Sequence, residues 1–187
     1  MLDSLLAFPG VEEHSVLRSR FGVLALHGGL EAGTAEIADA AAHAAGASLY
    51  AVVQPDDLHW HVPSHYFDPS LSPGLRDFLA HVDVVISVHG FGGLRGSDER
   101  WTTALLGGGN RPLAARLAGE LRNVLPHYRW VDDLSVIPAR LRGVHVENPV
   151  NRPPRKGVQI ELPPRVRRPG EDLDALIEVL TAAMLPR

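Results

Sequence analysis

The chain has 187 residues, of which 18 are Lys or Arg and 22 are Asp or Glu, so its formal net charge at pH 7 is −4. It contains no cysteine, which excludes disulfides, thiolate nucleophiles, iron–sulfur clusters and cysteine zinc sites. The acidic balance argues against a nucleic-acid surface, and no apolar run approaches the roughly 20 residues that cross a bilayer. The start lacks the basic segment of a secretory signal. We expect one soluble domain over residues 1–187.

Apolar runs of strand length alternate with helical patterns along the chain. The expected elements, in chain order, are a strand at Phe21–Leu26, a helix at Thr34–Ala45, a strand at Leu49–Val53, a helix at Pro73–Ala80, a strand at Val82–Val88, a helix at Arg111–Asn123, strands at Leu134–Ile137 and Val158–Leu162, and a helix at Glu171–Leu185. This alternation predicts an α/β fold with a mostly parallel central sheet flanked by helices.

Polar side chains follow three of the expected strands. His27 and Glu31 come after FGVLAL, His89 comes after VDVVISV, and Glu161 lies near the end of VQIEL. In open α/β sheets, ligands bind beyond the carboxyl ends of the strands, so neighbouring strands would bring these four residues to one edge. Two imidazoles and one carboxylate with an open fourth position form the ligand set of a catalytic zinc site. Such a zinc acidifies water, and a nearby carboxylate can take the proton.

Simpler interpretations exist for His27, Glu31 and His89. His27 and His89 each precede a glycine, and a His-Gly pair after a strand is commonly a turn. His27 can also bind a backbone carbonyl there. Glu31 fits an exposed turn or a favourable charge near the N-terminus of the following helix.

Glu161 is harder to explain without a function. It lies in an apolar strand, where a carboxylate needs either a partner or a role. Strand alternation places Val158, Ile160 and Leu162 on one face, and Gln159 with Glu161 on the other. Glu161 can therefore face a site while its apolar neighbours pack in the core.

Two further segments are rich in polar side chains. His59, His61 and His65 crowd together in LHWHVPSHYFDP, where they form either a second metal site or, as we expect, a wall of the pocket. The Pro-stiffened segment before the Glu161 strand contains Arg152 and Arg155. The planar guanidinium suits capture of a carboxylate or an oxyanion, although a solvated loop with ordinary surface cations has the same composition.

The ordered motifs resemble those of the poly-γ-glutamate hydrolases of phages and bacilli. The matching segments are HGGLEAGTAE at 27–36, LHWHVPSHYFDP at 58–69, VVISVHG at 84–90, GGGN at 107–110, NPVNRPPRKGVQIE at 148–161, and Arg167. The chain departs from the family pattern in two places. The spacing between His27 and Glu31 is one residue shorter, and the LHWHVPS segment is longer.

The resemblance implies a compact relative of the zinc carboxypeptidases with one catalytic zinc per chain. The residues that it assigns are His27, Glu31 and His89 as zinc ligands, Glu161 as general base, and Asn151, Arg152 and Arg167 as substrate contacts. The implied reaction is attack of a zinc-activated water on a γ-glutamyl amide in an acidic polymer or peptide.

Two other functions stay open. One is a zinc amidohydrolase that uses the same residues on a small N-acyl amino acid or a peptide terminus. The other is a non-catalytic module whose loops HGG, GFGG and GGGN bind an anion through backbone N–H groups. The second leaves His89 and Glu161 without a role, and no Gly-rich nucleotide-binding pattern accompanies it. A content of one zinc per chain is expected only for the hydrolases.

Overall fold

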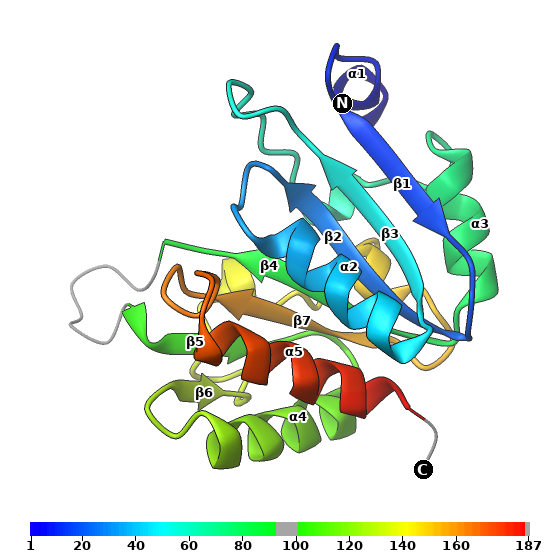
Figure 1. Ribbon diagram of the computed structural model, residues 1–187. Helices are drawn as coiled ribbons and strands as arrows, with labels where there is room; N and C mark the ends of the chain where they lie inside the picture. Colours follow the sequence, from blue (N-terminus) through cyan, green and yellow to red (C-terminus); the bar gives the residue numbers. More distant parts are fainter. Residues whose placement is uncertain (93–100, 186–187) are drawn as a thin grey trace.

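The computed structural model describes residues 1–92 and 101–185. Its centre is a mixed seven-stranded sheet in the order β1-β3-β2-β4-β7-β5-β6 (Figure 1). The strands are β1 (Glu12–Val16), β2 (Phe21–Gly28), β3 (Ser48–Val53), β4 (Val84–Gly90), β5 (Thr103–Leu106), β6 (Arg129–Val131) and β7 (Gly157–Leu162). The central strands β3, β2, β4 and β7 are parallel, whereas β1 is antiparallel to β3 and β5 is antiparallel to β7.

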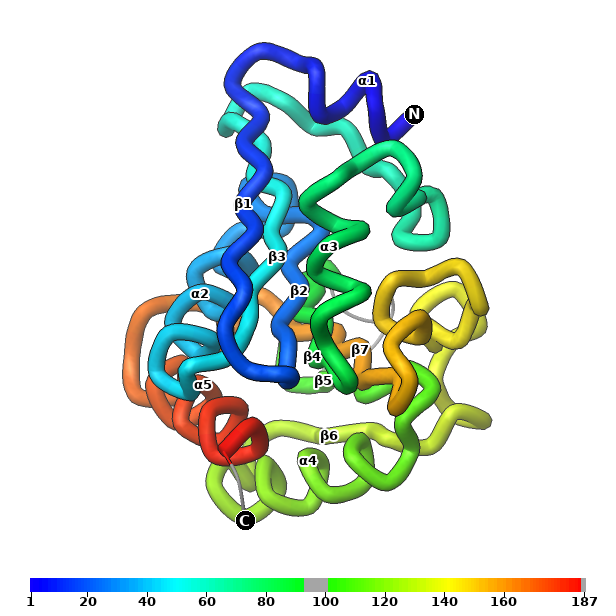
Figure 2. The backbone as a smooth tube through the Cα atoms, turned by 90° about the vertical axis from the view of Figure 1, so that its right-hand side faces the viewer, coloured from blue at the N-terminus to red at the C-terminus, as the bar shows by residue number. Residues whose placement is uncertain are grey.

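Helices cover both faces of this sheet. They are α1 (Leu2–Leu6), α2 (Thr34–Ala45), α3 (Pro73–His81), α4 (Arg111–Val124) and α5 (Glu171–Met184), with short 3₁₀ turns η1 (Ser64–Tyr66), η3 (Ala139–Leu141) and η4 (Pro149–Asn151). Figure 2 shows α2 and α5 on one side of the sheet and α3 on the other. The expected α/β class, with a mostly parallel sheet flanked by helices, is confirmed. Within the described ranges, no helix is long and apolar enough to cross a membrane.

Local sequence explains where the helices begin and which side they bury. Asn110 caps α4 by accepting the N–H of Leu113 at 3.1 Å, and the leucines at spacing four, Leu113, Leu117 and Leu121, are buried. These leucines join the larger core, which α2, α4 and α5 form against one face of the sheet. A second core lies under α1 and α3 on the opposite face.

The alternation expected in β7 is confirmed. Val158, Ile160 and Leu162 belong to the larger core, while Gln159 and Glu161 line a cavity on the other face. The structure therefore separates the packing residues of this strand from its polar residues, as a period of two requires.

The strand expected at Leu134–Ile137 is wrong, because that segment is a turn. The carboxylate of Asp133 accepts the backbone N–H of Ser135 at 2.8 Å and its hydroxyl at 2.7 Å, and an Asp that binds its own backbone in this way favours a turn over a strand. The actual strand, β6, lies a few residues earlier. Two other strands were not expected: β1 is exposed throughout and shows no burial alternation, and β5 has only four residues.

Candidate metal centre and active site

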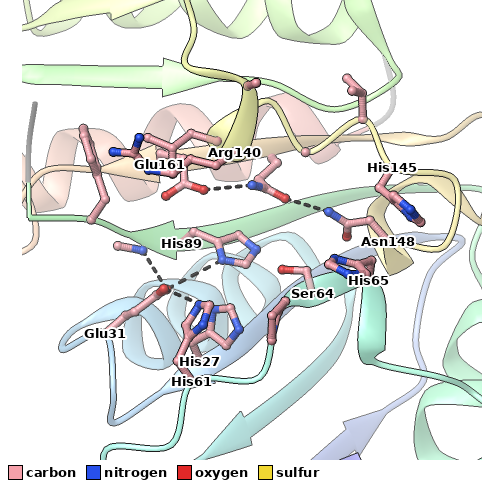
Figure 3. Close-up of a pocket in the computed structure, with 18 residues that line it drawn as sticks. His27, Glu31, His61, Ser64, His65, His89, Arg140, His145, Asn148 and Glu161 are labelled. Atoms are coloured by element: carbon pink, nitrogen blue, oxygen red, sulfur yellow. Dashed lines mark hydrogen bonds and ion pairs between the residues drawn. The ribbon is translucent and has the colours of Figure 1, made fainter.

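The carboxyl ends of β2, β4 and β7 meet at one edge of the sheet. β4 pairs in parallel with both other strands, and His89 lies directly beside Glu161 in the register of β4 and β7. His27 lies near the end of β2, and Glu31 follows in the next turn. All four side chains line a cavity of about 770 Å³ (Figure 3). The structure thus brings together the residues that the sequence placed after these strands.

An irregularity in β2 turns His27 toward this cavity. Val23 and Ala25 face the larger core, and strict alternation would place His27 on that same face. The register of β2 against β3 shifts between Ala25 and Gly28. The His27 ring instead contacts Phe67 of the second core, with the ring centroids 5.9 Å apart. Bulges commonly redirect side chains beside functional sites, and this one places His27 on the face that His89 occupies.

A glycine turn returns the chain from His27 to Glu31. Gly29 has φ +76°, and a Cβ at this position would lie 2.0 Å from the carbonyl oxygen of Gln54. The backbone N–H of Glu31 donates to the carbonyl of His27 at 2.8 Å. The carbonyl of Glu31 in turn accepts the hydroxyl of Thr34 at 2.8 Å. The tight turn therefore holds Glu31 over the end of β2 despite the short spacing in the sequence.

The carboxylate of Glu31 lies between two imidazoles. Its Oε1 is 3.0 Å from Nδ1 of His27, and its Oε2 is 3.7 Å from Nδ1 of His89. Oε2 also accepts the backbone N–H of Gly90 at 2.8 Å. One ligand atom from each of the three side chains lies within 4.8 Å of the other two. This group can hold a metal ion.

Hydrogen bonds at Nε2 orient the imidazole rings of His27 and His89. Nε2 of His27 donates to the carbonyl of Val62 at 2.8 Å, and because a carbonyl only accepts, this nitrogen carries a proton. Nε2 of His89 lies 2.9 Å from Oγ of Ser87, which can accept its proton. Partners of this kind set the tautomer of metal-binding histidines. Each ring can therefore present the lone pair of Nδ1 toward Glu31.

Burial and neighbouring charges perturb the titration of the cluster. Burial lowers the pKa of His89 to about 4, which favours the neutral imidazole that binds metals. Burial, reinforced by the charge of Glu31, raises the pKa of Glu161 to about 8. Burial opposes the charged forms of His27 and Glu31 as well, but the hydrogen bond between them raises the pKa of His27 and lowers the pKa of Glu31.

A chain of buried amides holds the carboxyl of Glu161. Nδ2 of Asn148 donates to Oε1 of Gln159 at 2.9 Å, and Nε2 of Gln159 donates to Oε1 of Glu161 at 2.8 Å. All three residues are only 4 % exposed. A Cβ at Gly143 would lie 2.6 Å from Oε1 of Gln159, so the absence of a side chain there lets the backbone pack against the amide. One oxygen of Glu161 is thereby fixed.

Asn151, an expected substrate contact, forms hydrogen bonds with three backbone groups. Its Nδ2 donates to the carbonyls of Gly143 at 2.7 Å and His145 at 2.9 Å. Its Oδ1 accepts the N–H of Gly109 at 2.8 Å. Asn151 is not among the residues that line the cavity, and it joins the GGGN loop to the cavity wall.

The two arginines of the same segment also lie outside the cavity lining. Arg152 forms an ion pair with the carboxylate of Glu147. Arg155 lines a different cavity together with Phe21 and Val84, which are the first residues of β2 and β4. Arg155 therefore lies at the amino ends of these strands, whereas His27 lies at the carboxyl end of β2.

The side chain of Arg167 joins the turn that contains Glu31 to the end of β7. Its Nε donates to the carbonyl of Leu162 at 3.2 Å, and its Nη1 donates to the carbonyl of Ala32. A Cβ on Gly90 would lie 2.7 Å from its Cζ. Burial lowers the pKa of Arg167, but a guanidinium stays charged at neutral pH. The substrate-binding roles of Asn151, Arg152 and Arg167 stay predictions.

The histidine-rich segment does form part of the wall. His61 and His65 line the cavity and His59 does not; the rings of His61 and His27 are 4.8 Å apart. Over residues 1–92 and 101–185, the cluster around Glu31 is the one group of three or more such side chains spaced for a metal. The last residue of the GFGG loop, Gly93, lies outside the described residues.

Sequence reasoning gave no role to several of the other lining residues. Gln159, Arg140 and His145 all face the cavity. Gln159 shares a strand face with Glu161, and this alternation is a signal that identifies it. Arg140 and His145 lie between β6 and β7 in a segment without strands, and no spacing in the sequence marks them.

Comparison with known proteins gives the family. Residues 7–169 match the family model described as poly-gamma-glutamate hydrolase. This chain belongs to the poly-γ-glutamate hydrolase family. Membership makes it a hydrolase that acts on peptide-type bonds.

Solved structures share the fold of this family member. The structure of a bacteriophage poly-gamma-glutamate hydrolase aligns with a TM-score of 0.79 at 20% identity, covering 97% of this chain and 92% of the other. The zinc-free apo form of YNDL aligns with a TM-score of 0.76 at 23% identity, covering 93% of this chain and 89% of the other. No curated protein matches the sequence significantly.

We expect Gly29→Ala to destabilise the protein and to weaken binding of added zinc. Left-handed backbone costs a non-glycine residue about 1–2 kcal/mol, and the clash with the Gln54 carbonyl brings the total to about 2–5 kcal/mol. Gly46→Ala is the matched control, because Gly46 has φ +61° but no atom within 4 Å of its Cβ position. Thermal unfolding and zinc titration of both variants measure the effects. Equal losses in the two variants would show that the Gly29 contact does not shape the site.

Proposed function

We propose that this protein is a zinc-dependent hydrolase that cleaves the γ-glutamyl amide of poly-γ-glutamate or of a related γ-linked peptide. The main support for this proposal is that one cavity contains both a possible metal-binding cluster and a buried carboxyl group. His27, Glu31 and His89 form a cluster spaced for a metal, and Glu161 lies beside His89 on the adjacent strand. Family membership supports the substrate, and the zinc-free state named for one structural neighbour supports the metal.

The donor set suits zinc. Imidazole and carboxylate are both zinc ligands, and one ligand atom from each of the three side chains lies within 4.8 Å of the other two. When bound, zinc supplies a Lewis acid that polarises a carbonyl and acidifies water. His27, Glu31 and His89 would hold the ion, and since all three line the cavity, a fourth position would be open to water or substrate, as in catalytic zinc sites.

Glu161 is the proton carrier in the proposed reaction. It accepts a proton from water as the water oxygen forms a bond to the amide carbon. It then returns this proton to the amide nitrogen as the C–N bond breaks, giving a carboxylate and an amine. Burial raises the pKa of Glu161 toward neutral pH, and a proton carrier acts best when its pKa is near the working pH. Gln159 and Asn148 keep the carboxyl in position through their hydrogen bonds.

Zinc binding tests the proposed ligands. We expect the wild-type chain to bind one zinc, His89→Ala to lose it because two ligands hold a catalytic zinc poorly, and Glu31→Gln to bind it far more weakly. His61→Ala is the control, since His61 lines the same cavity outside the cluster. Metal analysis after dialysis against a chelator is the measurement. Stoichiometric zinc in His89→Ala would remove His89 from the ligand set.

Glu161→Gln tests the proton carrier. The substitution keeps the shape of the side chain and removes its basic oxygen, so we expect kcat to fall by about 10²–10⁴-fold with zinc content and melting temperature close to wild type. Kinetics on a γ-glutamyl oligomer and metal analysis measure the two properties. Full activity in a folded, zinc-loaded variant contradicts the mechanism, and loss of zinc would identify Glu161 as a ligand.

A panel of substrates tests the linkage. We expect the zinc-loaded protein to cleave γ-linked glutamate oligomers, to leave α-linked oligomers and N-acetylglutamate largely intact, and to lose activity in chelator until zinc is restored. Chromatography of the products after timed digestion is the measurement. Preferred cleavage of N-acetylglutamate would instead establish a small-molecule amidohydrolase.

A further inference from the structure

A guanidinium group that no sequence motif indicated lines the cavity. Among the described residues, Arg140 is the one Arg or Lys that lines it. Arg140 lies on η3, and two hydrogen bonds hold this turn. The N–H of Leu141 donates to the carbonyl of Pro138 at 2.8 Å, and Nε of Arg142 donates to the carbonyl of Ile137 at 2.9 Å. The Arg140 side chain is exposed, and within the described chain it forms no hydrogen bond or ion pair. A fixed turn therefore presents an uncompensated guanidinium to the cavity.

A pair of imidazoles occupies another part of the same cavity. The rings of His65 and His145 lie 4.8 Å apart with an interplanar angle of 36°, and they come from segments widely separated in sequence. The backbone N–H of Glu147 donates to Nδ1 of His145 at 3.2 Å. Because that nitrogen accepts, the ring proton of His145 is on Nε2, which remains available as a donor. Figure 3 shows this pair beside Ser64 and Asn148, apart from the group formed by His27, Glu31 and His89.

The proposed substrate presents carboxylates in a particular place. In a γ-linked glutamate chain, the carbon bonded to each amide nitrogen carries a free α-carboxylate, so one such group lies close to every scissile bond. The protein has a net charge of −4 and therefore offers a polyanion no general attraction. Local donors must bind these carboxylates, and guanidinium and imidazole N–H groups are suited to that task.

We propose that Arg140 and the His65–His145 pair form two carboxylate subsites, which bind the free α-carboxylates of residues on the two sides of the scissile amide. This proposal rests on the proposed function and deepens it. The two subsites line different parts of one cavity, which the metal cluster and Glu161 also line. An α-linked glutamate chain carries its carboxylates at the ends of longer side chains, so it does not present them at the same positions.

Kinetics with matched variants test the subsites. Steady-state rates on a γ-linked glutamate oligomer are measured for the zinc-loaded wild type, for Arg140→Gln, and for the double variant His65→Gln/His145→Gln. Loss of a charged hydrogen bond at an exposed site predicts a fall in kcat/KM on the order of tenfold for each, mainly through KM. Arg76→Gln is the control, because Arg76 is an exposed cation of α3 that pairs with Asp77 and does not line the cavity; we expect it to change kcat/KM less than twofold.

A modified substrate separates carboxylate binding from other effects. In an oligomer whose α-carboxylates are converted to carboxamides, the wild type should lose the advantage that the two subsites provide, and Arg140→Gln should then match the wild type. Arg140→Lys should recover part of the activity on the carboxylate oligomer, since it keeps the charge and loses the planar fork. Melting temperatures check that each variant is folded.

The outcomes distinguish the two proposals. If the wild type cleaves the γ-linked oligomer but Arg140→Gln and the histidine variant match it, or match Arg76→Gln, the subsites are wrong and the proposed function stands. An equal loss on the carboxylate and carboxamide oligomers also overturns the subsites. If the wild type cleaves no γ-linked oligomer, both proposals fall.

Discussion

The buried carboxylate of Glu31 is the interaction on which the site depends. It accepts the N–H of Gly90 at the end of β4 and contacts the imidazoles of both His27 and His89. The turn that carries it is joined to the end of β7 through Arg167. The Glu31 carboxylate thus connects the ends of β2 and β4, and Arg167 connects the same turn to the end of β7. Because removing one partner from a buried charged cluster leaves the others uncompensated, these contacts act as a unit.

The sequence predicted what depends on local periodicity and on strand ends. It predicted α2 with its observed bounds. It also predicted that His27, His89 and Glu161 meet at one edge if their strands are neighbours, because each lies at or just after the end of a buried strand. It could not predict the shift in β2 that redirects His27, since a bulge depends on pairing with β3 rather than on the residues of β2 alone. The apolar run at Leu134–Ile137 misled for a different, local reason: the side chain of Asp133 accepts the backbone N–H of Ser135 and forms a turn.

In the polar segment before β7, the structure shows contacts that residue types alone do not predict. Asn151 and Arg152 are the kinds of residue that bind anions, yet the structure engages Asn151 with three backbone groups and Arg152 with Glu147. Buried backbone groups in a Pro-rich loop need partners, and side chains with several donors supply them. Arg140, the arginine that lines the cavity, lies in an irregular segment whose sequence has no hydrophobic periodicity.

The position of β7 has a consequence for how the site comes into being. β7 lies between β4 and β5 in the sheet, although at least fifty residues separate it from either one in sequence. Strand pairings over such separations close long loops and form slowly. A nascent chain that ends before β7 already carries His27, Glu31 and His89 but lacks Glu161, so metal affinity and hydrolytic competence need not arise together during synthesis. A metal that binds only the native arrangement then draws the folding equilibrium toward the completed sheet.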